Sequence, residues 1–166
     1  IVPWQMYQQY GDVRILEQHY ASMVAYMDYL ERRAVRYVQP FGGFGDWLAI
    51  EPTNSMLTNT AYSAYDALIM EQVAKRLGKD ADQRRFRTFY ENVKRSFNDL
   101  FVNEEGRTFA PTVESIFGKD SQVGMWPGTA ATEAKIVDTQ TSYVVPLQFD
   151  LFNEKNKPLA IRHLVE

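Results

Sequence analysis

A carboxylate and an indole stand side by side in a glycine-rich stretch, Phe41-Gly42-Gly43-Phe44-Gly45-Asp46-Trp47. Its glycines allow the backbone to approach a ligand closely. A carboxylate accepts hydrogen bonds from sugar hydroxyls, and the flat face of an indole covers the C–H surface of a sugar ring. Asp46 and Trp47 are therefore candidate sugar-binding residues. The alternative is a turn followed by a Trp that packs in the core.

Few other residues offer chemistry of this kind. With no cysteine, and with His19 and His163 far apart, neither a metal site nor a His-driven nucleophile is expected. Among the carboxylates outside the expected helices, Asp138 is better explained as a helix N-cap and Glu51 as a solvated turn residue before a proline. The remaining loop carboxylates are Glu114, Asp120 and Glu133.

The composition narrows the classes of partner. The chain has 166 residues, of which 45% are hydrophobic and 23% are charged, as in an ordinary globular domain. A net charge of -3 without a basic run gives no reason to expect a nucleic acid. No apolar run approaches the roughly 20 residues of a membrane span. The absence of cysteine fits both the cytoplasm and an exported location.

Helices must position these residues, because apolar residues recur at three- and four-residue steps over most of the chain. Gly11 and Gly78 are expected to end helices, and Asp12 and Asp138 to cap them. Only Lys79 separates Gly78 from the next capping residue, so an antiparallel helical hairpin should form there. The expected helices span residues 2–10, 12–36, 58 or 59 to 77, 80–101 and 139–152, with a sixth after 153.

Residues 103–135 follow no helical period. A short strand is expected at 108–110, and any strand should be confined to this region. A break this long in a compact helical fold is usually functional or disordered, and its aromatic and aliphatic residues argue against disorder. Trp126, within this break, is a further candidate for contact with a sugar.

A unit made of a long loop, an apolar helix, a tight joint and a charged helix occurs twice. Repeated helical hairpins predict an all-α fold, either a solenoid or a closed α/α toroid. In a closed toroid the long loops emerge on one face, at the N-termini of the inner helices, where helix dipoles attract carboxylates and hydroxyl-rich ligands. That face would then bring together Asp46, Trp47, Trp126 and Gln140.

The order of several short motifs carries a family resemblance. They are Val2-Pro3-Trp4, Tyr10-Gly11-Asp12, Phe44-Gly45-Asp46-Trp47-Leu48-Ala49, Thr60-Ala61-Tyr62 and Asp138-Thr139-Gln140-Thr141-Ser142-Tyr143. In this order they resemble bacterial α-L-rhamnosidases, specifically the middle of the catalytic (α/α)6 toroid of glycoside hydrolase family seventy-eight. The resemblance covers nearly the whole chain. Since both ends lie within helical patterns, we expect residues 1–166 to be part of a larger six-hairpin catalytic domain.

The resemblance implies an activity and a set of roles. Such enzymes release terminal α-L-rhamnose with inversion, using a carboxylic acid and a carboxylate about 6.5–9.5 Å apart. Their general-acid Glu precedes the segment that matches this chain, and their general-base Glu follows it. We therefore expect no catalytic residue here. The expected substrate-binding residues are Asp46, Trp47, Trp126 and Gln140, the partner is a rhamnosyl glycoside or a rhamnose-containing polysaccharide, and no cofactor is implied.

Two other classes remain open. Another α/α-toroid enzyme, either a different glycosidase or a polysaccharide lyase, would share the helices and the aromatic loops. A lyase would also need a Tyr or His base beside a charge-neutralising group, and no such pair is evident. A helical-repeat protein-binding module would use short regular joints and a consensus in every repeat, unlike these long and dissimilar loops.

Overall fold

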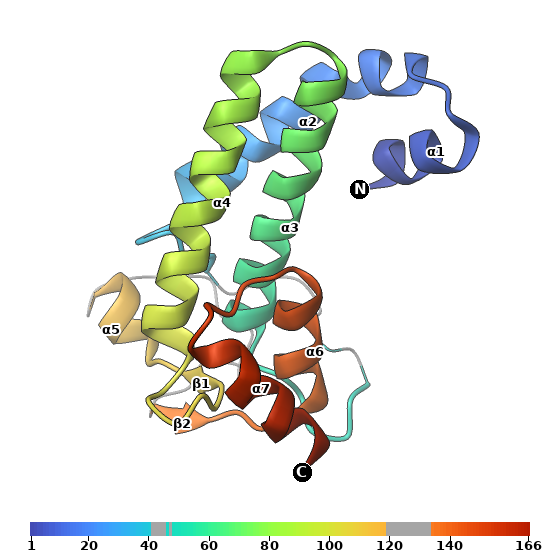
Figure 1. Cartoon of the computed structure of the whole chain (residues 1–166). Helices are drawn as coiled ribbons and strands as arrows, with labels where there is room; N and C mark the ends of the chain where they lie inside the picture. The colour runs from blue at the N-terminus through green and yellow to red at the C-terminus, as the bar shows by residue number, and fades with distance from the viewer. Residues whose placement is uncertain (41–45, 47, 119–133) are drawn as a thin grey trace.

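Helices dominate the computed structural model, which describes residues 1–40, 46, 48–118 and 134–166 (Figure 1). This confirms the expected fold class. In chain order the elements are α1 (Val2–Tyr10), α2 (Arg14–Arg33), α3 (Ser55–Arg76), α4 (Asp80–Phe101), β1 (Phe109–Ala110), α5 (Val113–Phe117), β2 (Lys135–Ile136), α6 (Gln140–Gln148) and α7 (Asn156–Val165).

The hairpin of α3 and α4 is the centre of the fold. α4 buries a stripe of aromatic residues, including Phe86, Phe97 and Phe101, and keeps its charged face in water. α3 is buried on much of its circumference. Gly78, at φ 67°, turns the chain between them, and the Lys79 N–H donates to the Ala74 carbonyl at 2.8 Å. The predicted antiparallel hairpin is therefore present, and α4 has the predicted bounds.

Other helix ends differ from the expectation. α1 ends at Gly11, at φ 71°, as predicted. α3 begins earlier than predicted, because the Asn54 side chain accepts hydrogen bonds from the N–H groups of Met56 and Leu57 and so caps the helix. α2 is shorter at both ends than predicted, and after it the chain turns through Arg36 and Tyr37, both at positive φ.

The second hairpin, formed by α6 and α7, also differs from the prediction. Thr139, and not Asp138, is the N-cap of α6, since its side chain accepts from the Ser142 N–H. α6 ends at Gln148, short of the predicted 152, and contains Pro146. α7 carries Pro158 in its first turn, as expected.

The region predicted to be irregular contains more structure than expected. β1 pairs antiparallel with β2, Phe109 opposite Ile136 and Ala110 opposite Lys135. The strands thus lie where predicted, except that β2 extends one residue past 135. The short helix α5, capped by Thr112, was not predicted.

α3 and α6 begin at the same end of the molecule, the lower end in Figure 1, where β1 and β2 also lie. α4 and α7 run in the opposite direction. The two hairpins share one core, in which the rings of Tyr65 and Phe149 stack with their centroids 4.3 Å apart. Within the described residues, no helix is both long and apolar enough to cross a membrane.

Candidate functional site

The carboxylate of Asp46 is linked by hydroxyl groups to the start of α6. The Thr53 hydroxyl donates to Asp46 Oδ2 at 3.0 Å, and its oxygen lies 2.6 Å from Thr139 Oγ1. Thr139 Oγ1 in turn accepts from the Ser142 N–H at 3.2 Å. Both threonines are buried and Asp46 is partly buried. This contact brings Asp46 to the N-terminal end of α6.

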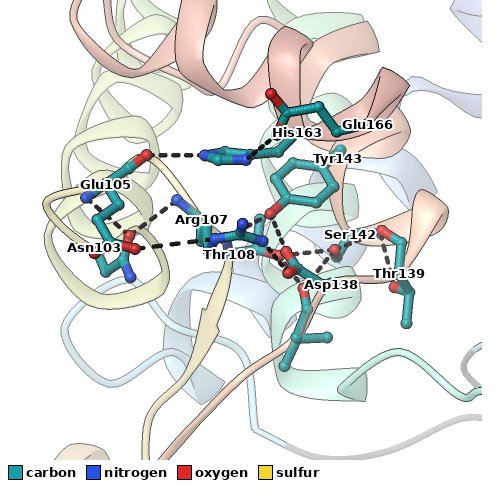
Figure 2. Close-up of polar contacts among 11 residues, drawn as sticks. Asn103, Glu105, Arg107, Thr108, Asp138, Thr139, Ser142, Tyr143, His163 and Glu166 are labelled. Atoms are coloured by element: carbon teal, nitrogen blue, oxygen red, sulfur yellow. Dashed lines mark hydrogen bonds and ion pairs between the residues drawn. The ribbon is translucent and has the colours of Figure 1, made fainter.

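Next to this link, the Asp138 carboxylate has two partners of its own (Figure 2). The Arg107 guanidinium forms an ion pair with Asp138 Oδ2, and the Tyr143 hydroxyl donates to Asp138 Oδ1. The same Tyr143 oxygen accepts from the Thr108 N–H at 3.3 Å. Burial raises the pKa of Tyr143, and the hydrogen bond to Asp138 adds to the shift. Through these two contacts Asp138 connects the residues before β1 to α6.

A cluster of buried hydroxyls completes the base of the site. Thr108 Oγ1 and Ser142 Oγ lie 2.7 Å apart, and both contact the Val137 carbonyl. Ser142 also contacts the carbonyl of Thr139 at 2.7 Å. Because buried polar groups are costly unless they are paired, these contacts fix the backbone that leads into α6.

His163 packs behind the Arg107 turn (Figure 2). Its side chain is only 7% exposed, and Nε2 lies 3.0 Å from the Glu105 carbonyl, which can only accept. Nε2 therefore carries a proton. The other ring nitrogen lies 3.5 Å from a carboxylate oxygen of Glu166. These contacts anchor α7 against the turn at Glu105.

Of the four predicted substrate-binding residues, the structure places Asp46 and Gln140 in segments that meet at the start of α6. Gln140, the first residue of α6, is exposed and directly follows Thr139, the residue linked to Asp46 through Thr53. Asp46 and Asp138 therefore lie at the same end of the helices, as the toroid prediction requires. Trp47, predicted to be partly exposed in the concavity, and Trp126 lie outside the described residues.

The described carboxylates of this end differ in how they are held. Asp138 is held by Arg107 and Tyr143, and Glu51 is exposed in the loop before α3. Asp46 Oδ2 accepts a hydrogen bond from the Thr53 hydroxyl, while Asp46 Oδ1 has no hydrogen-bond partner among the described residues. No group of three or more His, Asp or Glu residues in the described ranges could hold a metal ion. The site suits recognition of hydroxyl groups.

Sequence reasoning missed the residues that support Asp46. No sequence pattern singled out Thr53, and Thr139 was notable only as the neighbour of Asp138, the predicted cap. Thr53 directly precedes the Asn54 cap of α3, and Thr139 caps α6, so two adjacent helix starts carry hydroxyl residues. That coincidence was the available signal, but it does not predict a contact between residues 86 positions apart.

A polar hollow of about 210 Å³ lies between α2 and α3. It shares no residue with the network around Asp46. Burial raises the pKa of Asp66, in its lining, to about 6. The other lining residues are Tyr26, Tyr29, Leu30, Arg33, Gln39, Pro40, Asn59, Tyr62 and Ser63.

Antiparallel helical hairpins with loops gathered at one end define an α/α-hairpin class of domain, and comparison with known proteins gives the family. Residues 1–166 match the model of the bacterial alpha-L-rhamnosidase 6 hairpin glycosidase domain. The chain belongs to this family.

Its relatives are much longer proteins. The chain is 29% identical to an alpha-L-rhamnosidase of Formosa agariphila, over 100% of this chain and 16% of that protein. It is 32% identical to an alpha-L-rhamnosidase of Streptomyces avermitilis, over 99% of this chain and 13% of the relative. The crystal structure of a Streptomyces avermitilis alpha-L-rhamnosidase complexed with L-rhamnose superposes with a TM-score of 0.76 at 27% identity, covering 99% of this chain and 13% of that one. The chain thus spans about one-seventh of the length of these relatives.

Proposed function

We propose that these 166 residues are part of a longer inverting α-L-rhamnosidase, which hydrolyses terminal α-L-rhamnosides and takes its general acid and general base from outside this segment. The segment contributes sugar-binding loops, with Asp46 accepting hydrogen bonds from sugar hydroxyls and Trp47 covering one face of the ring. Gln140 and Trp126 add contacts from the second hairpin. A nucleic acid is not a partner in this proposal.

The observation that carries the proposal is the link from Asp46 through Thr53 to Thr139. It joins the loop before α3 to the loop before α6, so that an acid, an exposed amide side chain and two helix N-termini are gathered at one end. Helix N-termini favour ligands rich in oxygen. Family membership supports a carbohydrate as that ligand, in preference to a protein partner of a helical-repeat module.

The carboxylates also support an outside source for the catalytic pair. Inversion requires two carboxyl groups with room for a water molecule between them. Among the described loop residues, Asp138 is already paired with Arg107 and Tyr143, and Glu51 is an exposed turn residue directly before Pro52. One carboxylate cannot act as both acid and base in one displacement. The 166-residue chain alone is therefore expected to release no rhamnose from an aryl α-L-rhamnoside.

The test uses the full-length protein and a panel of aryl glycosides that differ only in the sugar. Asp46→Asn should lower kcat/KM on the rhamnoside about 10- to 150-fold, because a charge-assisted hydrogen bond is weakened. Trp47→Ala should raise KM about tenfold with a smaller effect on kcat, since substrate and transition state share the stacking face. Asp99→Asn, an exposed acid on α4, is the matched control and should leave both constants unchanged.

Two results would contradict the proposal. Wild-type constants for both Asp46→Asn and Trp47→Ala would make the glycine-rich loop a scaffold. A clear preference of the wild-type protein for a glycoside other than the α-L-rhamnoside would keep the glycosidase class and reject the substrate.

A further inference from the structure

The hydroxyl link between Asp46 and α6 has a defined direction. A threonine hydroxyl has a single proton, and a carboxylate oxygen accepts. The Thr53 hydroxyl donates its hydrogen bond to Asp46 Oδ2. In the bond between Thr53 and Thr139, the Thr139 hydroxyl must therefore be the donor. The Thr139 oxygen then accepts the Ser142 N–H. Every hydrogen bond in the series therefore points the same way, from the backbone N–H of α6 to the Asp46 carboxylate.

The link is also rigid. Thr53 is 4% exposed and Thr139 is 9% exposed, so neither hydroxyl exchanges its partner freely with water. Threonine is β-branched and has few χ1 rotamers. Thr53 precedes the cap of α3, and Thr139 is itself the cap of α6, so each side chain is attached to a fixed helix start. A carboxylate held this way loses little freedom when a ligand binds.

We propose that Thr53 is a positioning residue for sugar binding, which fixes the Asp46 carboxylate through Oδ2 and leaves Oδ1 directed to the ligand, while Thr139 fixes Thr53. This inference rests on the proposed role of Asp46. It makes the start of α6 part of the binding site without direct contact with the sugar. The fit of the first loop to its ligand then depends on the second hairpin.

The experiment compares Thr53 with a matched threonine in the full-length protein. Thr53→Val removes the hydroxyl and keeps the shape, and should lower kcat/KM on an aryl α-L-rhamnoside about tenfold. Thr53→Ser restores the hydroxyl and should recover activity to within about threefold of the wild type. Thr58→Val is the control, because Thr58 is equally buried in the first turn of α3 but donates to the Ser55 carbonyl, outside the link. It should leave kcat and KM unchanged.

A double variant separates positioning from general damage. If Thr53 acts through Asp46, Thr53→Val in an Asp46→Asn background should cause little further loss in kcat/KM. Additive losses would overturn the inference, and so would wild-type constants for Thr53→Val together with an impaired Asp46→Asn, a result that leaves the proposed function intact. Wild-type constants for Asp46→Asn would instead reject the proposed function. If Thr53→Val does not fold, Thr53→Ala makes the same comparison without a methyl group facing Asp46 and Thr139.

Discussion

The side-chain amide of Asn98, on α4, meets that of Asn156, at the start of α7, with 2.9 Å between Oδ1 and Nδ2. Asn98 Oδ1 also accepts from the Asn153 N–H, and its Nδ2 donates to the carbonyls of Leu151 and Lys94. All four hydrogen-bonding positions of this buried amide are thus occupied. One side chain joins the first hairpin to the turn of the second.

Replacing Asn98 should therefore be costly. Asn98→Ala removes the buried partners of the Leu151 carbonyl and of the Asn156 side-chain amide, and should reduce the free energy of unfolding by about 2–4 kcal/mol. Asn92→Ala, on the same helix, loses two exposed bonds, one to the Tyr37 hydroxyl and one from the Arg95 guanidinium, and should cost about 0.5 kcal/mol or less. Urea unfolding followed by circular dichroism measures both. Equal losses would show that the amide network is not what joins the hairpins.

Gly106 and Gly78 should respond differently to the same substitution. Both have positive φ, 77° and 67°, so alanine strains the backbone at either position by about 1–2 kcal/mol. At Gly106 an added Cβ would also lie 2.3 Å from Leu159 Cβ on α7, whereas at Gly78 it would meet nothing within 4 Å. Gly106→Ala should thus cost about 1–3 kcal/mol more than Gly78→Ala. Thermal unfolding of the two variants decides it, and equal melting temperatures would place α7 further from this turn.

The stability of the protein should depend on pH through Asp66. Its pKa is about 6 in the folded state and near 3.8 in the unfolded chain, so the folded state binds the extra proton between these values. Stability contributed by the protonated carboxyl is complete below about pH 3.8 and is lost as the pH rises through 6, at a cost of about 2–3 kcal/mol. Asp66→Asn removes this dependence.

The measurement for Asp66 is the urea midpoint at pH 4 and pH 7.5. At pH 7.5 the Asn variant should be more stable than the wild type, and at pH 4 the two should be similar. A difference in midpoint that is the same at both pH values would contradict the assignment.

Sequence patterns predicted the helices well where packing and propensity agree. The bounds of α4 follow from its Phe stripe and from the Asp80 start after a glycine. The sequence patterns failed where a polar residue could either cap a helix or make another contact. Asn54 caps α3 ahead of the predicted start at 58 or 59, and Asp138 was predicted to cap a helix but pairs with Arg107 and Tyr143. Asp, Asn and Thr cap helices with similar geometry, so one sequence cannot decide among neighbours of these types.

For the site, the sequence predicted which end of the helices would hold Asp46 and Gln140, because hairpins alternate direction. The support of Asp46 by Thr53 and Thr139 was beyond its reach, since isolated hydroxyls have no period and the partners come from different hairpins. The two tryptophans, Trp47 and Trp126, stay predictions.

The turn at Gly78 also sets the order in which the molecule can assemble. Contacts between α3 and α4 close a loop of only a few residues, whereas the Thr53–Thr139 contact joins residues 86 apart. Short loops close at lower entropic cost and therefore earlier. The α3–α4 hairpin should form first during refolding, and the end that carries Asp46 should be completed last. Amide protons at the start of α6 should then gain protection later than those in the middle of α4, so that the proposed sugar-binding end is the last part of the chain to form.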